Sequence, residues 1–410
     1  MKSVFYNKQK VLNFCFYLFV FVLPFKLILS PIALALLIVV YLAVGDKVDL
    51  LKRVKENKTT LLIVFLYLIN IMGLVLSSQY GITYTRIQTQ LFLFLVPLIF
   101  IALNLNSEHI FFVKNVYIFS CILFCLLAFI TLLYNLIVNY EHRLDYNFVQ
   151  TSMYHFHYPY DVLCVNIGYI FLLFNAKANR LKPLYALLFF LFIILSGVRI
   201  GLAIFSLITV VYLVLNYKSF LNYKSFLVFI VFLILGFILI KNSRYVNDKF
   251  FDSLHKIGFK TEKYVSDIGA EYHKMTFRQK LWNSSVTALE NSPNFIFGYG
   301  PQGSRETLNQ IYKSKGYDGI DNMNSHNQYL TTILNNGLIG VATVLCIFFF
   351  GLQGSFKVKS ISNVLLVLVI SISFVTESML ERQKGVAIFA IFLTLILVEN
   401  TMLIGEKQSR

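Results

Sequence analysis

The sequence predicts an all-α, multi-pass integral membrane protein, and three observations support that fold class. Of the 410 residues, 57% are hydrophobic and only 14% are charged, and the mean hydropathy is +0.69. A soluble domain usually carries about 25% charged residues. Apolar runs of the length that a bilayer core requires, about 20 residues each, recur along almost the whole chain. We therefore expect a bundle of about twelve transmembrane helices with one large hydrophilic loop.

The expected helices follow these apolar runs in chain order. They are placed at residues 11–29, 31–45, 60–77, 87–104, 110–139, 160–175, 183–197, 199–216, 225–241, 327–353, 361–376 and 386–404. The first run follows three lysines and reaches the small-residue stretch "IALA", which is typical of a signal peptide and its cleavage site. A second apolar run begins at once, so an uncleaved first helix is expected instead.

Cationic residues predict the orientation of the helices. Lys and Arg in short connections are retained on the cytoplasmic side, and here they concentrate in "DKVDLLKRVKENK", in "AKANRLK" and at Lys114. Both termini are therefore expected in the cytoplasm. The chain divides into helices one to nine over residues 1–241, a large external loop over 242–325, and helices ten to twelve over 326–410. Topology then explains the net charge of +16, and no basic patch for nucleic acid is expected.

The large loop carries helical and turn signals of its own. An apolar spacing over residues 246–257 suits a helix lying on the membrane surface. The stretch "TFRQKLWNSSVTALENSP" reads as a helix in which Thr276 and Gln279 have capping-box spacing and Arg278 lies in the first turn. "FGYGPQG" at 297–303 is expected to be a glycine-punctuated turn.

His326 stands where the hydrophilic loop meets the tenth apolar run. Ser325 and Gln328 also have capping-box spacing, which predicts His326 at the first helical position, beside unpaired amides and the positive end of the helix dipole. That position disfavours the imidazolium, so a neutral imidazole acting as a general base is reasonable there. The same amides would also favour the binding of a phosphate. The alternative is a histidine merely tolerated at an interface.

Further charged residues are expected on the same external side. Arg199 lies in "LSGVRIGLAIF", between two expected helices, and a charge there is costly unless it is paired or snorkels. Arg86 begins the fourth helix and is either a substrate contact or a snorkelling anchor. Glu377, Glu381 and Arg382 lie in "TESMLERQKG", which is either part of the site or a solvated, self-paired turn.

No metal or other cofactor is expected. The sequence has no paired-aspartate motif of the DxD type, no HExxH and no Cys/His cluster, and its five cysteines all fall in apolar runs. The glycines near residues 298–303 lack the strand and the Lys-Ser/Thr of a phosphate-binding loop.

Taken in order, these motifs resemble the O-antigen ligase and O-antigen polymerase superfamily of bacterial inner-membrane glycosyltransferases. The resemblance rests on the helix pattern, the large loop after helix nine, "SGVRIG" before helix eight, the "R...W" helix followed by "FGYG", and "SHNQYL" leading into "GLIG". "SGVRIG" departs from the "SGSRGG" that the family often shows, and we expect the arginine to keep its role.

The resemblance implies a GT-C-like, metal-independent, inverting transferase in the bacterial inner membrane, with its loop in the periplasm. Its donor would be a glycan on undecaprenyl pyrophosphate, and its acceptor lipid A-core for a ligase or another lipid-linked glycan for a polymerase. Arg199 and Arg278 match the arginines thought to hold the pyrophosphate, and His326 matches the essential histidine. Arg86, Asn327 and Glu377 are the expected substrate-binding residues. We favour the ligase.

A transporter or flippase for the same glycolipids is the alternative from another class. Such a protein should carry ionisable residues deep within several helices and a repeat of its two halves. Here the middles of the expected helices are nearly uncharged and no such repeat is visible.

Overall fold

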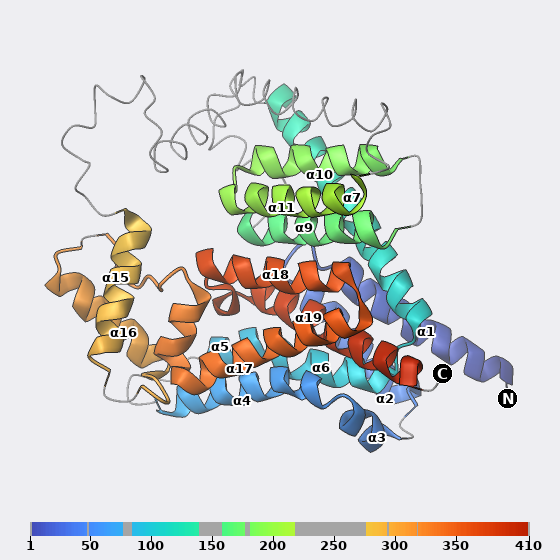
Figure 1. The fold of residues 1–410 in the computed structure, drawn as a ribbon, viewed down its shortest axis with the longest axis horizontal. Helices are drawn as coiled ribbons and strands as arrows, with labels where there is room; N and C mark the ends of the chain where they lie inside the picture. The colour runs from blue at the N-terminus through green and yellow to red at the C-terminus, as the bar shows by residue number, and fades with distance from the viewer. Residues whose placement is uncertain are drawn as a thin grey trace. The chain divides into compact units, whose positions relative to one another are not determined.

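The part of the chain that the structure describes folds mainly into helices. The computed structural model describes residues 2–46, 49–76, 84–138, 158–176, 181–217, 276–292, 295–317 and 319–408. Of these residues, 85% are helical and none lies in a strand, which confirms the predicted all-α class (Figure 1).

The apolar helices coincide with the predicted runs. Among the described residues, five segments are long and apolar enough to cross a membrane: Lys58–Val75, Tyr84–Leu103, Ser107–Val138, Gln328–Val358 and Gln383–Lys407. Shorter apolar helices are Leu29–Val44 (α2), Tyr158–Phe174 (α9), Lys182–Ser196 (α10), Arg199–Leu215 (α11) and Ile361–Thr376 (α18). The predicted helix at 225–241 and the predicted surface helix at 246–257 lie outside the described residues. The count of twelve spans stays a prediction.

Two details at the N-terminal side correct the sequence interpretation. The first helix, α1, spans Lys2–Phe21 and does not reach residue 29, because Pro24 follows and a proline ring cannot continue the helical hydrogen bonding. Lys114 does not belong to a connection. It lies inside α7 (Ser107–Val138), is 2% exposed, and places its amino group 5.7 Å from the ring centroid of Phe171.

The chain forms two compact units. Unit 1 comprises Met1–Leu23, Leu27–Val113 and Met275–Arg410, and unit 2 comprises Pro24–Lys26 and Lys114–Lys274. In unit 1, α17 (Gln328–Val358) packs against α4 (Leu61–Leu76), α16 (Gly300–Ser314), α18 and α19 (Gln383–Gln408). In unit 2, α9 packs against both α10 and α11. The predicted division at residues 241 and 325 stays a prediction.

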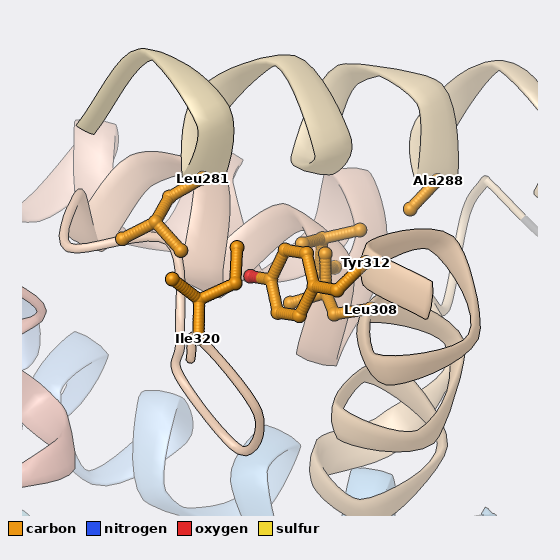
Figure 2. Close-up of a cluster of buried hydrophobic side chains, with 6 residues drawn as sticks. Leu281, Ala288, Leu308, Tyr312 and Ile320 are labelled. Atoms are coloured by element: carbon orange, nitrogen blue, oxygen red, sulfur yellow. The ribbon is translucent and has the colours of Figure 1, made fainter. Parts of the chain in front are cut away.

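A small hydrophobic core holds the described part of the large loop together. The helix α15 (Phe277–Glu290) contributes Leu281 and Ala288, and α16 contributes Leu308 and Tyr312, which pack with Ile320 in Figure 2. Leu334 of α17 completes this cluster. The loop therefore shares buried apolar side chains with the helix that follows it.

The helix α16 was not predicted. The expected turn over 297–303 ends at Gly300, where α16 begins with Pro301 in its first turn. Proline suits that position because the first N–H groups of a helix have no intrahelical partner. The glycines around Pro301 indicated a turn and not the start of a helix. The buried side chains of α16 pack against α15 and α17.

The helix α17 is interrupted at Gly337, whose φ of 62° and ψ of −159° are not helical. The backbone of residues 295–299 fills the interruption, since the N–H of Leu338 donates to the carbonyl of Phe295 at 3.0 Å. Backbone polar groups freed by a helix break must be satisfied by neighbouring protein. Here the loop supplies that partner.

Glycine is required on both sides of this junction. A Cβ on Gly337 would collide with the carbonyl of Ile296, and a Cβ on Gly298 would lie 2.6 Å from the carbonyl oxygen of Leu334. The N–H of Tyr299 donates to that same carbonyl at 2.8 Å. The "FGYG" and "NNGLIG" motifs are therefore two halves of one backbone contact.

Candidate active site

The start of α17 differs from the prediction. Asn327, not Ser325, is the N-cap, and its side-chain oxygen accepts from the N–H groups of Tyr329 at 2.9 Å and Leu330 at 3.1 Å. The predicted capping box of Ser325 with Gln328 is therefore wrong, and so is a helical position for His326. The reason is local, because the asparagine two residues later caps the helix instead, so the helix begins at Gln328. Substrate binding by Asn327 stays a prediction. Its side-chain oxygen already accepts hydrogen bonds from these two helix amides.

His326 lies just outside the helix in a left-handed conformation. Its φ is 45°, and its N–H donates to the side chain of Asn324 at 3.0 Å. A left-handed residue other than glycine costs about 1–3 kcal/mol and persists where its surroundings hold it. The ring of Phe277 meets the imidazole edge-on, with centroids 5.9 Å apart. The backbone and an aromatic neighbour thus position the His326 ring.

The predicted helix that carries Arg278 is confirmed, including its capping box. The hydroxyl of Thr276 accepts from the N–H of Gln279 at 3.4 Å, and the Gln279 side chain accepts from the N–H of Thr276 at 2.8 Å. Two unpaired backbone donors are satisfied in this way, which fixes where α15 begins. Arg278 follows in the first turn of α15, as predicted.

Glu377 joins Arg278 to His326. Its Oε1 lies 3.5 Å from the Nη2 of Arg278, and its Oε2 lies 3.5 Å from the Nδ1 of His326. The side chain of Glu377 is 19% exposed, whereas those of Arg278 and His326 are 48% and 32% exposed. A carboxylate beside Nδ1 favours the tautomer whose proton is on that nitrogen, which leaves Nε2 as the acceptor. The exposed Arg278 can also bind an anion.

The segment that carries Glu377 packs against α17 and is not a solvated loop. Met379 and Leu380 are buried in the short helix η4 (Met379–Glu381), and the N–H of Leu380 donates to the side chain of Gln328 at 2.6 Å. The hydroxyls of Ser378 and Thr331 are 2.8 Å apart. The interpretation of this connection as a solvated, self-paired turn is therefore wrong, because its side chains bond to α17.

Arg86 forms a second ion pair next to this group. It lies in α5 (Tyr84–Gln90), and its guanidinium makes two hydrogen bonds to the carboxylate of Glu381, one of them at 2.8 Å from Nη1. Asn335 donates to the same carboxylate at 3.3 Å. Both charged side chains are mostly buried. Arg86 therefore has a protein partner, in contrast to a freely snorkelling arginine.

A cavity of about 180 Å³ adjoins these residues in unit 1. It is lined by Arg86 and Glu381, by residues of α16, by Asn335 of α17, and by the Asn324–Ser325 segment that precedes His326. Among the described residues, no group of three or more His, Cys, Asp or Glu side chains is arranged to hold a metal ion.

Arg199 belongs to unit 2 and is described there by itself. Gly197 ends α10 in the left-handed conformation, and Arg199 begins α11 two residues later with its side chain exposed. The predicted glycine-containing link between two helices is confirmed. The structure thus brings Arg278, Glu377 and His326 together in unit 1, while a shared site with Arg199 stays a prediction.

Sequence reasoning named Glu381 without a specific role in the site and missed Asn335 and Arg305. Glu381 offered one signal, because a buried arginine such as Arg86 needs an acidic partner from another external connection. Asn335 and Arg305 line the cavity from α17 and α16. They gave no comparable signal, since the folding of α16 against α17 brings them there.

The central part of the chain matches a known protein family. A family model described as O-antigen ligase matches residues 184–345, a range that includes Arg199, Arg278 and His326. Comparison with curated proteins gives no match. The apolar helices and this match together indicate an integral membrane protein. Over residues 184–345, the chain is therefore similar to the O-antigen ligase family, which supports the O-antigen ligase and O-antigen polymerase superfamily that its motifs predict.

Proposed function

We propose that the protein is an inverting, metal-independent glycosyltransferase that moves a glycan from undecaprenyl pyrophosphate to an acceptor hydroxyl at the periplasmic face of the inner membrane. The family match supports glycosyltransferase activity of the O-antigen ligase or polymerase type. The observation that carries the finer proposal is the Arg278–Glu377–His326 arrangement, in which one carboxylate lies 3.5 Å from a guanidinium and 3.5 Å from an imidazole.

The proposed reaction needs a base and a stabiliser of the leaving group. The acceptor oxygen attacks the anomeric carbon, its proton passes to the Nε2 of His326, and the bond between that carbon and the pyrophosphate oxygen breaks. The electron pair leaves with undecaprenyl pyrophosphate. Attack opposite the leaving group inverts the anomeric configuration.

The arginines stabilise the charge that develops on the pyrophosphate. A guanidinium binds phosphate oxygens bidentately, and such a bond strengthens as negative charge accumulates in the transition state. Arg278 retains 48% of its side-chain exposure beside Glu377, so its second edge is available for the anion. Arg199 is assigned the same role from the family resemblance and its exposed position at the start of α11.

We assign the acceptor as lipid A-core, which makes the protein an O-antigen ligase. The assignment rests on the likeness of the "SHNQYL" motif and its placement to the ligase branch. Both substrates contain lipid, which fits a site at the ends of apolar helices. We assign both termini to the cytoplasm from the distribution of Lys and Arg, which assigns residues 242–325, and with them Arg278, to the periplasm.

Two assays test the proposal. Full-length protein in lipid vesicles, supplied with lipid-linked glycan and lipid A-core, should consume the donor and release free undecaprenyl pyrophosphate. Transport of intact donor without release would contradict a transferase. In cells, deletion of the gene should leave lipid A-core without any O-chain. A core carrying a single repeat unit would instead identify a polymerase.

A further inference from the structure

The cavity beside His326 has walls that suit a sugar. Its volume of about 180 Å³ is below the roughly 300–1,000 Å³ of pockets for drug-sized ligands. Such a space fits a small polar unit, not a polyprenyl chain. Most of the lining side chains offer amides or hydroxyls, including Thr85, Thr89, Gln302, Ser304, Asn322 and Asn335.

The charges in the wall argue against a phosphate. Arg86 makes two hydrogen bonds to the carboxylate of Glu381, so its charge is neutralised within the wall. A second phosphate site would place an anion against that carboxylate, which like-charge repulsion disfavours. The remaining cation, Arg305, lies exposed on α16 and makes no ion pair with any described residue. A neutral wall of donors and acceptors, with one open guanidinium, matches a polyhydroxylated ligand.

The cavity and the proposed catalytic group share structural elements. Asn324 and Ser325 line the cavity, and His326 follows them directly in the chain. Glu381 lines it from the docked connection that also carries Glu377. A ligand held there would therefore lie next to the segment that carries His326.

We propose that this cavity binds one saccharide unit of a glycan substrate, an inference that rests on the proposed glycosyltransferase function. The sugar hydroxyls exchange hydrogen bonds with the amide and hydroxyl side chains of the wall, and Arg305 closes the open edge. The pyrophosphate binds elsewhere, at Arg278. The cavity therefore orients sugar, and the arginine of α15 binds phosphate.

Equilibrium dialysis of full-length protein in lipid nanodiscs tests the binding. One arm uses the radiolabelled oligosaccharide released by mild acid from the host's undecaprenyl-linked glycan, and the other uses core oligosaccharide released from lipid A-core. At least one should bind, and the arm that binds identifies the donor or the acceptor as the source. Excess inorganic pyrophosphate should leave this binding unchanged. Failure of both oligosaccharides to bind, or displacement by pyrophosphate, would overturn the inference.

Variants locate the binding. Thr89→Val removes a hydroxyl from the wall and Arg305→Gln removes its open guanidinium, and each should raise the dissociation constant about three- to tenfold. Lys313→Gln is the matched control, because it removes one exposed cation from the same helix, away from the cavity. Equal binding by all three variants and the wild type would reject the cavity as the site.

Kinetics separate this inference from the proposed function. In the transfer assay, Thr89→Val should raise KM for one substrate and leave kcat unchanged, as expected for lost binding of ground state and transition state alike. His326→Ala should keep oligosaccharide binding and lose transfer. A protein that transfers glycan without binding either oligosaccharide contradicts only the cavity. A protein that binds oligosaccharide without transferring contradicts only the proposed enzyme.

Discussion

The carboxylate of Glu377 lies 3.5 Å from the Nδ1 of His326, and its other oxygen lies 3.5 Å from the guanidinium of Arg278. The three residues come from a helix C-cap, a left-handed residue and the first turn of a loop helix. This relationship gives the histidine an orienting partner and leaves its outer nitrogen free for a proton.

Replacing His326 by alanine should lower kcat by about 10² to 10⁴, the usual contribution of a general base. The measurement is single-turnover release of undecaprenyl pyrophosphate from bound donor. Thermal unfolding of the variant in nanodiscs serves as the control and should match the wild type, since His326 is partly exposed. Activity close to normal would remove the base from the mechanism.

Glu377→Gln should keep the shape of the site and lower kcat about 10- to 100-fold, because a charge-assisted interaction with the imidazole is lost. Arg382→Gln is the control, being an exposed charge in the same connection. Transfer is assayed under identical donor saturation. Equal losses in the two variants would show that Glu377 has no specific role in orienting His326.

The Arg86–Glu381 pair should couple strongly in stability. Glu381→Gln leaves a mostly buried guanidinium without its partner and should lower the free energy of unfolding by about 3–5 kcal/mol. The double variant Arg86→Met with Glu381→Leu removes both charges and should recover part of that loss. A double-mutant cycle on thermal unfolding measures the coupling, and we expect at least about 1 kcal/mol. Additive single effects would mean that the pair is not formed.

Gly337→Ala should destabilise the junction between α17 and residues 295–299. The new methyl group collides with the carbonyl of Ile296, in addition to the left-handed strain of about 1–3 kcal/mol. Gly316→Ala separates the two effects, because Gly316 has a φ of 65° but open space around it. Limited proteolysis of the loop should accelerate for Gly337→Ala far more than for Gly316→Ala. Equal cleavage rates would contradict the backbone contact.

Loss of the cap at Asn327 should be mild and local. Asn327→Ala removes the acceptor for two amides of α17 and should cost about 0.5–2 kcal/mol of stability. Asn327→Asp keeps an acceptor oxygen and should retain most of it. Thermal unfolding distinguishes the two variants, and identical melting temperatures would show that the cap contributes little.

The sequence predicted those features that depend on nearby residues. The capping box of Thr276 and Gln279 was correct because both partners lie within one turn of the same helix. The same reasoning failed at Ser325, because Asn327, two residues later, can also cap and only the folded backbone selects it. Local spacing identifies candidates, and the fold chooses between them.

Long-range pairings could not be predicted. The ion pairs of Glu377 with Arg278 and of Glu381 with Arg86 join residues separated by 99 and 295 positions in the chain. The partners of the buried face of α16, which come from α15 and α17, likewise could not be predicted from local spacing. Apolar runs, by contrast, predicted the helices themselves. The length and composition of each run are enough to indicate a helix in an apolar environment.

The interrupted helix α17 imposes a constraint on how such proteins can diverge. Residues 334–339 of α17 and the segment 295–299 are joined by main-chain hydrogen bonds, so neither can be exchanged without the other. A chimera that combines a foreign loop with the α17 of this chain would lack the matching pair of glycines, Gly298 and Gly337. Loop and helix should therefore be inherited as one unit, and acceptor preference should travel with that unit when pieces of related chains are recombined.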